Sequence, residues 1–177
     1  MVEDQERLAD LYETWLAAEY DVRTAHTAGE ARELLDDDVD VALLDRRLPD
    51  GSGDDVLATI RERGIDARVA MVTAVDPDFD ILEMGFDDYV VKPVSEADLL
   101  GIVESLLGRE RYSSEIQRYY ALASKRATLE SEKSADELDS SREYEKLLAE
   151  LTDLRASLHE QASDLDESDY EALFRDL

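Results

Sequence analysis

Acidic side chains, a threonine and a lysine recur in the sequence where apolar runs end. Glu3 and Asp4 follow the first apolar residues of the chain, whereas Asp45, Thr73 and Lys92 each end a later run. In a doubly wound α/β sheet, ligands bind beyond the carboxyl ends of the central strands. We therefore expect these five side chains to meet at one edge of such a sheet.

These residue types predict phosphoryl chemistry that depends on a metal ion. Three carboxylates at one edge repel each other unless a cation joins them, and oxygen ligands suit Mg²⁺, which often binds beside a phosphate. A carboxylate held in this way can act as a nucleophile on phosphorus and form an acyl phosphate, here at Asp45. The Lys92 ammonium and the Thr73 hydroxyl would then donate to the phosphoryl oxygens.

The apolar runs themselves predict the strands that position these residues. Residues 41–45 and 68–73 are near-continuous apolar runs, which are typical of buried strands in a parallel sheet. Residues 20–25 alternate and predict an edge strand, and residues 89–91 predict another short strand. Helical patterns separate the strands, so we expect right-handed βαβ units and a doubly wound α/β fold.

Helix start signals precede the helical patterns between the strands. Thr27 and Ser95 each begin a capping box, and Ser52 is a further expected N-cap. Apolar residues at three- and four-residue spacing then predict helices over about residues 8–16, 31–35, 56–60 and 99–107.

The alternation of strands and helices stops near Gly108, and residues 109–177 contain no strand signal, proline or glycine. We therefore divide the chain into an α/β domain, residues 1–108, and a helical domain, residues 109–177. Capping boxes at Ser134 and Ser140 predict a helical hairpin, with one long helix as the alternative. A heptad seam of a coiled-coil type is predicted at Tyr144, Leu147, Leu151, Leu154, Leu158 and Leu165, with Gln161 as its polar exception.

Four motifs, taken in order, resemble those of response-regulator receiver domains. In Leu43-Leu-Asp-Arg-Arg-Leu-Pro-Asp-Gly-Ser-Gly53, a proline follows the aspartate by four residues and a glycine by eight. Met71-Val-Thr-Ala74 and Tyr89-Val-Val-Lys-Pro93 resemble the hydroxyl, switch-aromatic and lysine-proline motifs of the family. The resemblance covers about residues 1–107 and implies a flavodoxin-like, parallel five-stranded sheet of order 2-1-3-4-5 with a truncated first strand.

The resemblance also implies how the acidic site works. Asp45 would accept a phosphoryl group from a histidine kinase with Mg²⁺ as the cofactor. Asp4 and Asp45 would bind Mg²⁺, Glu3 would help through water, and the main-chain carbonyl of Arg47 would be a further ligand.

The same resemblance assigns the residues that respond to phosphorylation. Lys92 would pair with the phosphoryl group, and the Lys92-Pro93 peptide would be cis. Thr73 would move toward the phosphoryl group and Tyr89 would turn inward, which is a population shift driven by one new cluster of charge.

The tail resembles the HalX domain found on receivers of haloarchaea, in Tyr119-Tyr-Ala-Leu-Ala-Ser-Lys-Arg-Ala-Thr-Leu-Glu-Ser-Glu-Lys133. We expect the tail to pass the signal to an output protein of unknown identity, with homodimer formation as a further option. The chain is then a signalling protein and not an enzyme.

Composition supports a chain that folds in high salt. The formal net charge is -27, with 46 acidic residues, and only four of the 19 basic residues are lysines, as in proteins of salt-in halophiles. Molar salt screens the self-repulsion of such a surface; the alternative is an ordinary acidic protein. This charge argues against direct binding to nucleic acid. With no cysteine, no membrane span and no signal peptide, we expect a cytoplasmic protein without disulfides.

Other functions remain open at this point. A pseudo-receiver could bind partners without phosphorylation. A phosphatase of the haloacid dehalogenase type needs a second aspartate two residues after the nucleophile, where this chain has Arg47. A DNA-binding output lacks a recognition-helix pattern. Only Met1 and Val2 precede Glu3, so we expect the true start to lie upstream.

Overall fold

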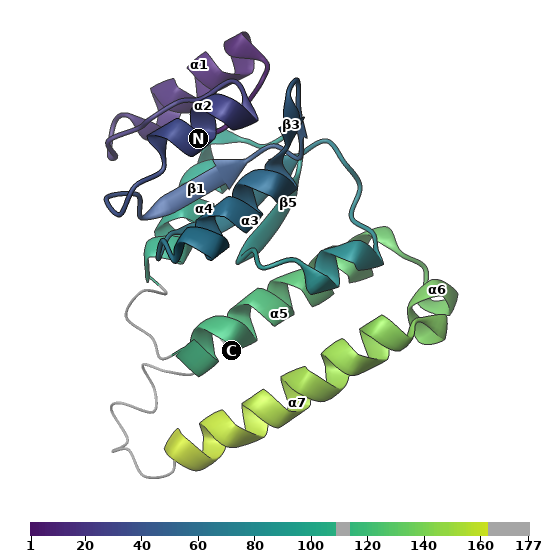
Figure 1. The fold of residues 1–177 in the computed structure, drawn as a ribbon. Coiled ribbons are helices and arrows are strands. Elements are labelled where there is room, and N and C mark those ends of the chain that lie inside the picture. Colours follow the sequence, from purple (N-terminus) through teal and green to yellow (C-terminus); the bar gives the residue numbers. More distant parts are fainter. Residues whose placement is uncertain (109–113, 163–177) are drawn as a thin grey trace.

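The structure is a computed structural model that describes residues 1–108 and 114–162 (Figure 1). The first part contains α1 (Glu6–Leu16), α2 (Ala28–Leu34), β1 (Val41–Leu44), β2 (Arg47–Leu48), β3 (Gly51–Ser52), α3 (Gly53–Arg63), β4 (Arg68–Thr73), the 3₁₀ helix η1 (Phe79–Glu83), β5 (Asp88–Val91) and α4 (Glu96–Gly108). The second part contains α5 (Ser114–Glu132), α6 (Ala135–Ser140) and α7 (Arg142–Ala162).

A parallel sheet of order β1-β4-β5 forms the centre of the first part. Val2 extends this order, because it forms parallel bridges with Leu44 on one side and with Ala25 on the other. The sequence of neighbours is therefore Ala25, Val2, β1, β4 and β5, which confirms the predicted α/β fold and its order 2-1-3-4-5.

The predicted edge strand over residues 20–25 is wrong in its extent, and the sheet has three full strands rather than five. Ala25 forms the bridge, donating its amide to the Met1 carbonyl at 2.9 Å and accepting from the Glu3 amide at 3.0 Å, and the Arg23 carbonyl accepts from the Met1 amino terminus at 2.6 Å. Residues 1–3 lie alongside only the end of this segment, so the alternating pattern of residues 20–25 does not extend into a full ladder. A cavity of about 220 Å³ lies here between the first residues, residues 20–25 and β1.

Helices cover both faces of the sheet, as the near-continuous apolar strands predict. On one face, α1 and α4 pack against the strands through a cluster that includes Tyr12, Leu43 and Leu99. On the other face, α2 and α3 enclose a second cluster that includes Ala31, Leu44 and Ile60. Both clusters fix the ends of the strands, where the candidate site lies.

Two local elements were not predicted from the sequence. β2 and β3 form a short antiparallel pair directly after Asp45 and deliver the chain to the Ser52 N-cap of α3. At Gly53, a Cβ atom would lie 2.2 Å from the main-chain oxygen of Asp45, so only glycine fits this close approach. The other element is η1, which follows the loop after β4.

The helical part is a hairpin, as predicted, with α6 at its turn. Ser134 caps α6 in a full capping box, while α7 is capped by Ser141 rather than by the predicted Ser140. Of the predicted seam, Tyr144, Leu147, Leu151 and Leu158 are buried and Leu154 is half-buried, whereas Leu165 lies outside the described residues. The seam faces α5 and η1 of the same chain.

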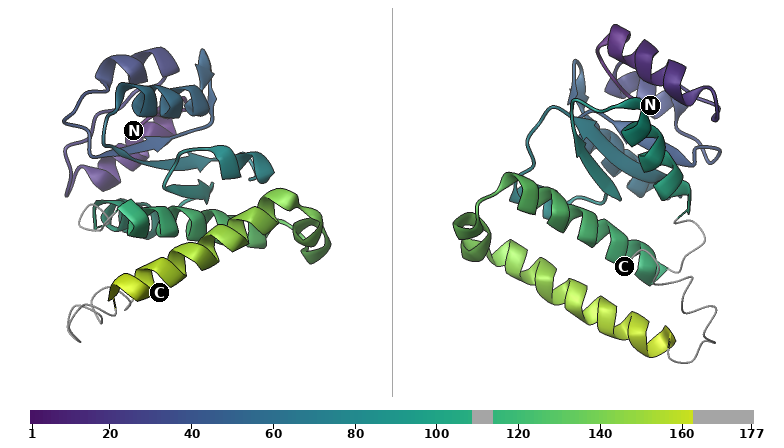
Figure 2. Two further views of the ribbon diagram at one scale, coloured as in Figure 1. Left: turned by 60° about the horizontal axis from the view of Figure 1, so that its bottom comes forward. Right: turned by 180° about the vertical axis from the view of Figure 1, so that it is seen from behind.

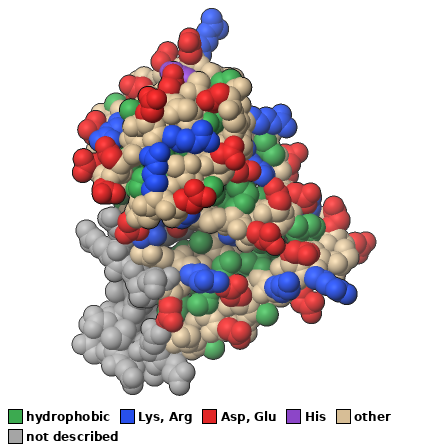
Figure 3. Space-filling view, viewed as in Figure 1, with side chains coloured by type: hydrophobic (Ala, Val, Ile, Leu, Met, Phe, Trp, Pro, Cys, Tyr) green, Lys and Arg blue, Asp and Glu red, His purple; other side chains and the backbone are tan. Residues whose placement is uncertain are grey.

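The hairpin lies along one edge of the α/β part, next to β5 and η1 (Figures 1 and 2). Leu122 and Leu129 of α5 belong to the same buried cluster as Phe86 and Tyr89. Figure 3 shows acidic side chains spread over this face, with hydrophobic side chains along the junction of the two parts. Within residues 1–108 and 114–162, no helix has the length and apolar character needed to cross a bilayer.

Candidate functional site

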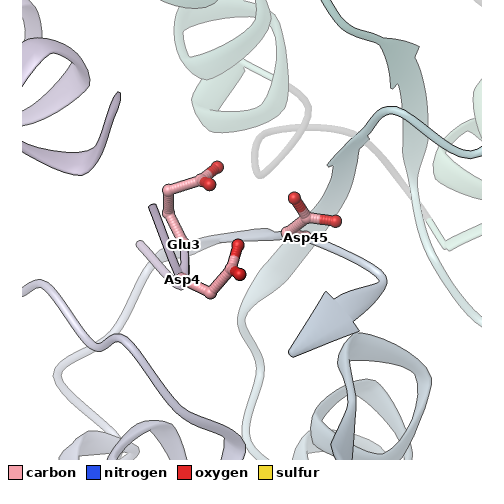
Figure 4. Close-up of side chains that lie close together, drawn as sticks. All are labelled: Glu3, Asp4 and Asp45. Carbon is pink, nitrogen blue, oxygen red and sulfur yellow. The ribbon is translucent and has the colours of Figure 1, made fainter. Parts of the chain in front are cut away.

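Three carboxylates meet at the carboxyl edge of the sheet. Glu3 and Asp4 follow the bridging residue Val2, and Asp45 follows β1. One carboxylate oxygen from each residue lies within 4.8 Å of the others (Figure 4). Glu3 is 2% exposed and Asp45 is 6% exposed, while Asp4 is open to solvent. This mixture of buried and open oxygen ligands suits a hard cation that keeps some of its water.

Lys92 places an ammonium between two of these acids. It directly follows β5, and its Nζ donates to Asp45 Oδ2 at 2.5 Å and also to Glu3 Oε2. Burial opposes the charged form of Lys92, but the hydrogen bonds to Asp45 and Glu3 outweigh it and raise its pKa. Burial also raises the pKa of Glu3, against the effect of Lys92. The ammonium therefore stays charged and compensates the buried acids.

Thr73 and the loop after β1 orient the Asp45 carboxylate. Thr73 ends β4, is fully buried, and donates its hydroxyl to Asp45 Oδ1 at 2.8 Å. The main-chain amide of Arg47 donates to the same oxygen at 3.0 Å. Oδ1 thus accepts from a hydroxyl and an amide and Oδ2 from an ammonium, so the carboxylate has a fixed orientation.

Tyr89 lies in β5, the strand that pairs with β4, at whose end Thr73 lies. Its side chain is buried, and its hydroxyl donates to the Val75 carbonyl at 2.8 Å. The Val75 amide in turn donates to Thr73 Oγ1 at 3.3 Å. Burial raises the pKa of Tyr89, so this hydroxyl stays a donor. The ring is therefore held in a buried position by the loop after β4, while its role as a switch stays a prediction.

Sequence analysis did not single out Arg46, which directly follows Asp45. Its guanidinium donates to Asp54 at 2.9 Å and to Asp80 at 2.6 Å. Against the effect of burial, a further hydrogen bond with the Tyr89 side chain helps to raise the pKa of Arg46. Arg46 thereby ties the loop after β1 to the start of α3 and to η1. The two consecutive arginines after the aspartate were a visible signal, but nothing in the sequence shows that Asp80 lies nearby.

The structure brings together Glu3, Asp4, Asp45, Thr73 and Lys92, as the strand ends predicted. The cis peptide at Lys92-Pro93 is confirmed. The main-chain carbonyl of Arg47 as a metal ligand stays a prediction, because only the amide of this residue has a defined contact at the site.

Comparison with known families matches residues 1–104 to the response regulator receiver domain and residues 108–174 to the HalX domain. A Haloferax volcanii protein described as "Putative transcriptional regulator" is 50% identical over 163 residues, which cover 92% of this chain and 28% of that protein. The transcriptional regulatory protein CpxR of Escherichia coli K12 is 34% identical over 121 residues, covering 66% of this chain and 52% of CpxR. The chain spans about half or less of the length of these relatives.

A solved structure shares the fold of the first part. The response regulator protein TrrA of Thermotoga maritima, in complex with Mg²⁺ and beryllofluoride, matches with a TM-score of 0.53 and 28% identity. The match covers 60% of this chain and 95% of TrrA. It agrees with the parallel sheet and its flanking helices.

Proposed function

Because the chain belongs to the response regulator receiver domain family, we propose that Asp45 accepts a phosphoryl group from a histidine kinase. An oxygen of Asp45 attacks the phosphorus of a phosphohistidine, the new P–O bond replaces the P–N bond, and the electron pair of the broken bond remains on the imidazole nitrogen. The product is an acyl phosphate on a buried carboxylate.

The arrangement of donors around Asp45 is the observation that carries this proposal. Lys92 and Thr73 each hold one oxygen of the carboxylate. Once one of these oxygens is bonded to phosphorus, the ammonium and the hydroxyl can donate to phosphoryl oxygens that carry more negative charge. These donors are fixed in place beforehand, so they need little reorganisation when charge develops.

The acidic cluster supports Mg²⁺ as the cofactor. Glu3, Asp4 and Asp45 supply only oxygen ligands, and the exposed side of Asp4 leaves room for water. Mg²⁺ would supply charge neutralisation between the acids and the incoming phosphoryl group. TrrA, which shares this fold, is in complex with Mg²⁺ and a beryllofluoride group.

The direct test is phosphorylation of the full chain by acetyl phosphate with Mg²⁺ in molar KCl, followed by intact mass. We expect the mass of one phosphoryl group on the wild type and none on Asp45→Ala. Asp37→Ala, which removes an exposed aspartate, is the matched control and should be phosphorylated like the wild type. Phosphorylation of Asp45→Ala to the wild-type level would overturn the assignment.

A phosphorylation-independent interaction module is the second candidate. It is favoured by one observation: Lys92 already compensates both Glu3 and Asp45, so the buried acids do not require a metal ion for stability. In that case, neither acetyl phosphate nor a kinase would modify the wild-type chain, with or without Mg²⁺. Partner binding would then be the same for the wild type and for Asp45→Ala.

The helical tail is proposed as the output element, acting on a partner protein. Two of the relatives are described as transcriptional regulators. A net charge of -27 opposes approach to a phosphate backbone, so any contact with DNA would come from a partner or from another part of a longer protein.

A further inference from the structure

The hairpin contacts the α/β part through one face of α5. Ser124 Oγ donates to Asp88 Oδ1 at 2.5 Å, and Lys125 Nζ donates to the Met84 carbonyl at 2.5 Å. Thr128 Oγ1 lies 3.5 Å from the main-chain oxygen of Tyr89. Leu122 and Leu129 flank these polar contacts in the shared buried cluster. The docking face of α5 is therefore defined by residues 122–129 and covers β5 and the segment after η1.

Lys125 makes this docking sensitive to local backbone geometry. The residue is 5% exposed, and its ammonium lies 4.8 Å from the centre of the Phe86 ring. A buried ammonium is costly unless its hydrogen bonds are made. Its acceptors here are the carbonyls of Leu82, within η1, and of Met84, which directly follows η1. Docking thus favours the conformation of this segment in which both carbonyls face α5.

A series of hydrogen bonds joins Asp45 to Tyr89, whose backbone lies against the docking face. Thr73 donates to Asp45, the Val75 amide donates to Thr73, and Tyr89 donates to the Val75 carbonyl. The main-chain oxygen of Tyr89 lies 3.5 Å from Thr128 Oγ1 on α5, whose hydroxyl donates to the Ser124 carbonyl at 2.9 Å, so this last step is a close packing contact. Two of the residues in this series, Thr73 and Tyr89, belong to the proposed switch.

A second connection runs through η1. Arg46, next to Asp45, holds Asp80 at 2.6 Å, and Lys133 at the end of the hairpin's first helix holds Asp78 at 3.0 Å. Lys133 also lies 5.6 Å from the centre of the Phe79 ring. The start of η1 is therefore bound by Arg46 next to the site and by Lys133 of the hairpin.

From these contacts we infer that the HalX-type hairpin is the receiver's own intramolecular partner, and that its docking on β5 and η1 is coupled to phosphorylation of Asp45. This inference rests on the proposed function. Docking is seen together with Thr73 bonded to Asp45 and with the Tyr89 ring buried, the positions that the receiver family assigns to the phosphorylated state. Phosphorylation therefore tightens docking, and by reciprocity docking favours phosphorylation.

Amide hydrogen exchange on the full chain tests this coupling, with Mg²⁺ and beryllofluoride as the phosphoryl analogue. Coupling energies between sites commonly correspond to factors of about 5 to 150, so exchange across residues 114–132 should slow about five-fold or more. Protection of the peptides around Asp45 and Lys92 reports separately whether the analogue binds. If those peptides are protected and α5 exchanges at an unchanged or faster rate, the coupling is wrong and the proposed function stands. If Asp45 binds no analogue, the proposed function and the coupling both fail.

A charge placed on the docking face provides the reciprocal test. Ser124→Glu sets a carboxylate against Asp88 and should loosen α5, whereas Ser131→Glu makes the same change at an exposed position of the same helix. In the wild type, the analogue slows exchange of α5 by some factor. We expect Ser124→Glu to weaken beryllofluoride binding by this same factor. Ser131→Glu should bind the analogue like the wild type. A Ser124→Glu chain with rapid α5 exchange and wild-type analogue affinity would overturn the inference.

Thr128→Val keeps the shape of the side chain and removes the hydroxyl, which lies 3.5 Å from the Tyr89 carbonyl oxygen and donates to the Ser124 carbonyl of α5 at 2.9 Å. Its effect on analogue affinity should have the same sign as that of Ser124→Glu and be smaller. The fluorescence of Trp15, which packs in the other core cluster, reports that the α/β part remains folded in each variant.

Discussion

Two lysines with largely enclosed side chains have opposite surroundings in this chain. Lys92 lies between the carboxylates of Asp45 and Glu3, and its pKa is raised, although burial alone would lower it. Lys125 lies at the docking face among main-chain carbonyls and the Phe86 ring, and burial lowers its pKa to about 8. Burial lowers the pKa of both lysines, but only Lys92 has carboxylate partners that reverse this shift.

The contrast distinguishes a chemical site from an interface. At the site, two buried acids and one ammonium form a compensated group that a cation or a phosphoryl group can rearrange. At the docking face, the ammonium is held by backbone oxygens, so it responds to the conformation of the segment that supplies them. The charged groups of the site can therefore take part in a reaction, whereas docking depends on the backbone conformation around Lys125.

Removing the ammonium of Lys92 should break the first region most severely. Lys92→Met leaves Glu3 and Asp45 buried without their shared cation, and loss of one partner from a buried pair costs about 3–5 kcal/mol. Urea denaturation without divalent ions measures this loss. Lys146→Met, at an exposed position, should stay within about 0.5 kcal/mol of the wild type. Equal losses in the two variants would show that Lys92 does not compensate the acids.

A methyl group at Gly53 should damage the same region through the backbone. Its Cβ would lie 2.2 Å from the Asp45 carbonyl oxygen, so Gly53→Ala is expected to cost about 1–3 kcal/mol and to lower phosphorylation. Gly101→Ala in α4 meets nothing within 4 Å and should instead gain about 0.5–1 kcal/mol. Denaturation curves and phosphorylation yields of both variants check the pair; a neutral Gly53→Ala would contradict the close approach.

The lowered pKa of Lys125 predicts that stability increases with pH. Between its folded pKa of about 8 and its ordinary value of 10.5, the unfolded chain binds the proton and the folded chain does not. Relative to Lys125→Met, the wild type should gain on the order of 1–2 kcal/mol from about pH 7.5 to 9.5.

Lys92 contributes little to this slope, because its pKa is 10.5 in the unfolded chain and higher in the folded chain, so it is largely charged in both states up to about pH 9.5. Denaturation of both proteins at the two pH values measures the difference. Asp87 and Glu150 favour the charged form of Lys125 and so reduce the stability gained between the two pH values. Arg118 disfavours the charged form and has the opposite effect. Parallel pH dependence of wild type and variant would show that Lys125 is not desolvated by docking.

The smallest effect is expected at the outer surface of the hairpin. Arg126 and Glu130 form an ion pair at 2.9 Å, with about half of the arginine side chain exposed. Arg126→Gln should cost no more than about 0.5 kcal/mol in dilute buffer, and this cost should vanish in molar KCl because salt screens exposed charges. Thermal melts at both salt concentrations measure it. A cost that persists in molar KCl would mean that the pair is part of the buried structure.

The site was predictable from the sequence because strand ends carry it. A parallel sheet brings the ends of its strands to one edge, so Asp45, Thr73 and Lys92 could be grouped without knowing any distance. The docking of the hairpin was not predictable in this way, because Ser124 and Asp88 lie 36 residues apart and share no local pattern.

Some of the missed features left a signal in the sequence. Lys125 falls in a stripe with Leu122 and Leu129 at helical spacing, and a lone lysine within an apolar stripe indicates a buried ammonium. The extent of the edge strand was overestimated because the alternating pattern of residues 20–25 shows which faces its side chains take, but not whether a neighbouring strand pairs with it. A strand also needs a partner of matching length, and only residues 1–3 lie alongside this one.

The stripe of Tyr144, Leu147 and Leu151 on α7 is already occupied, because it packs against α5 and η1 of its own chain. Two copies could therefore associate through this stripe only by domain swapping, in which the α7 of each molecule packs in the place of its partner's α7. Such an exchange would require the turn at α6 to open, so dimers of this kind would form slowly, persist after dilution, and accumulate under conditions that loosen the hairpin.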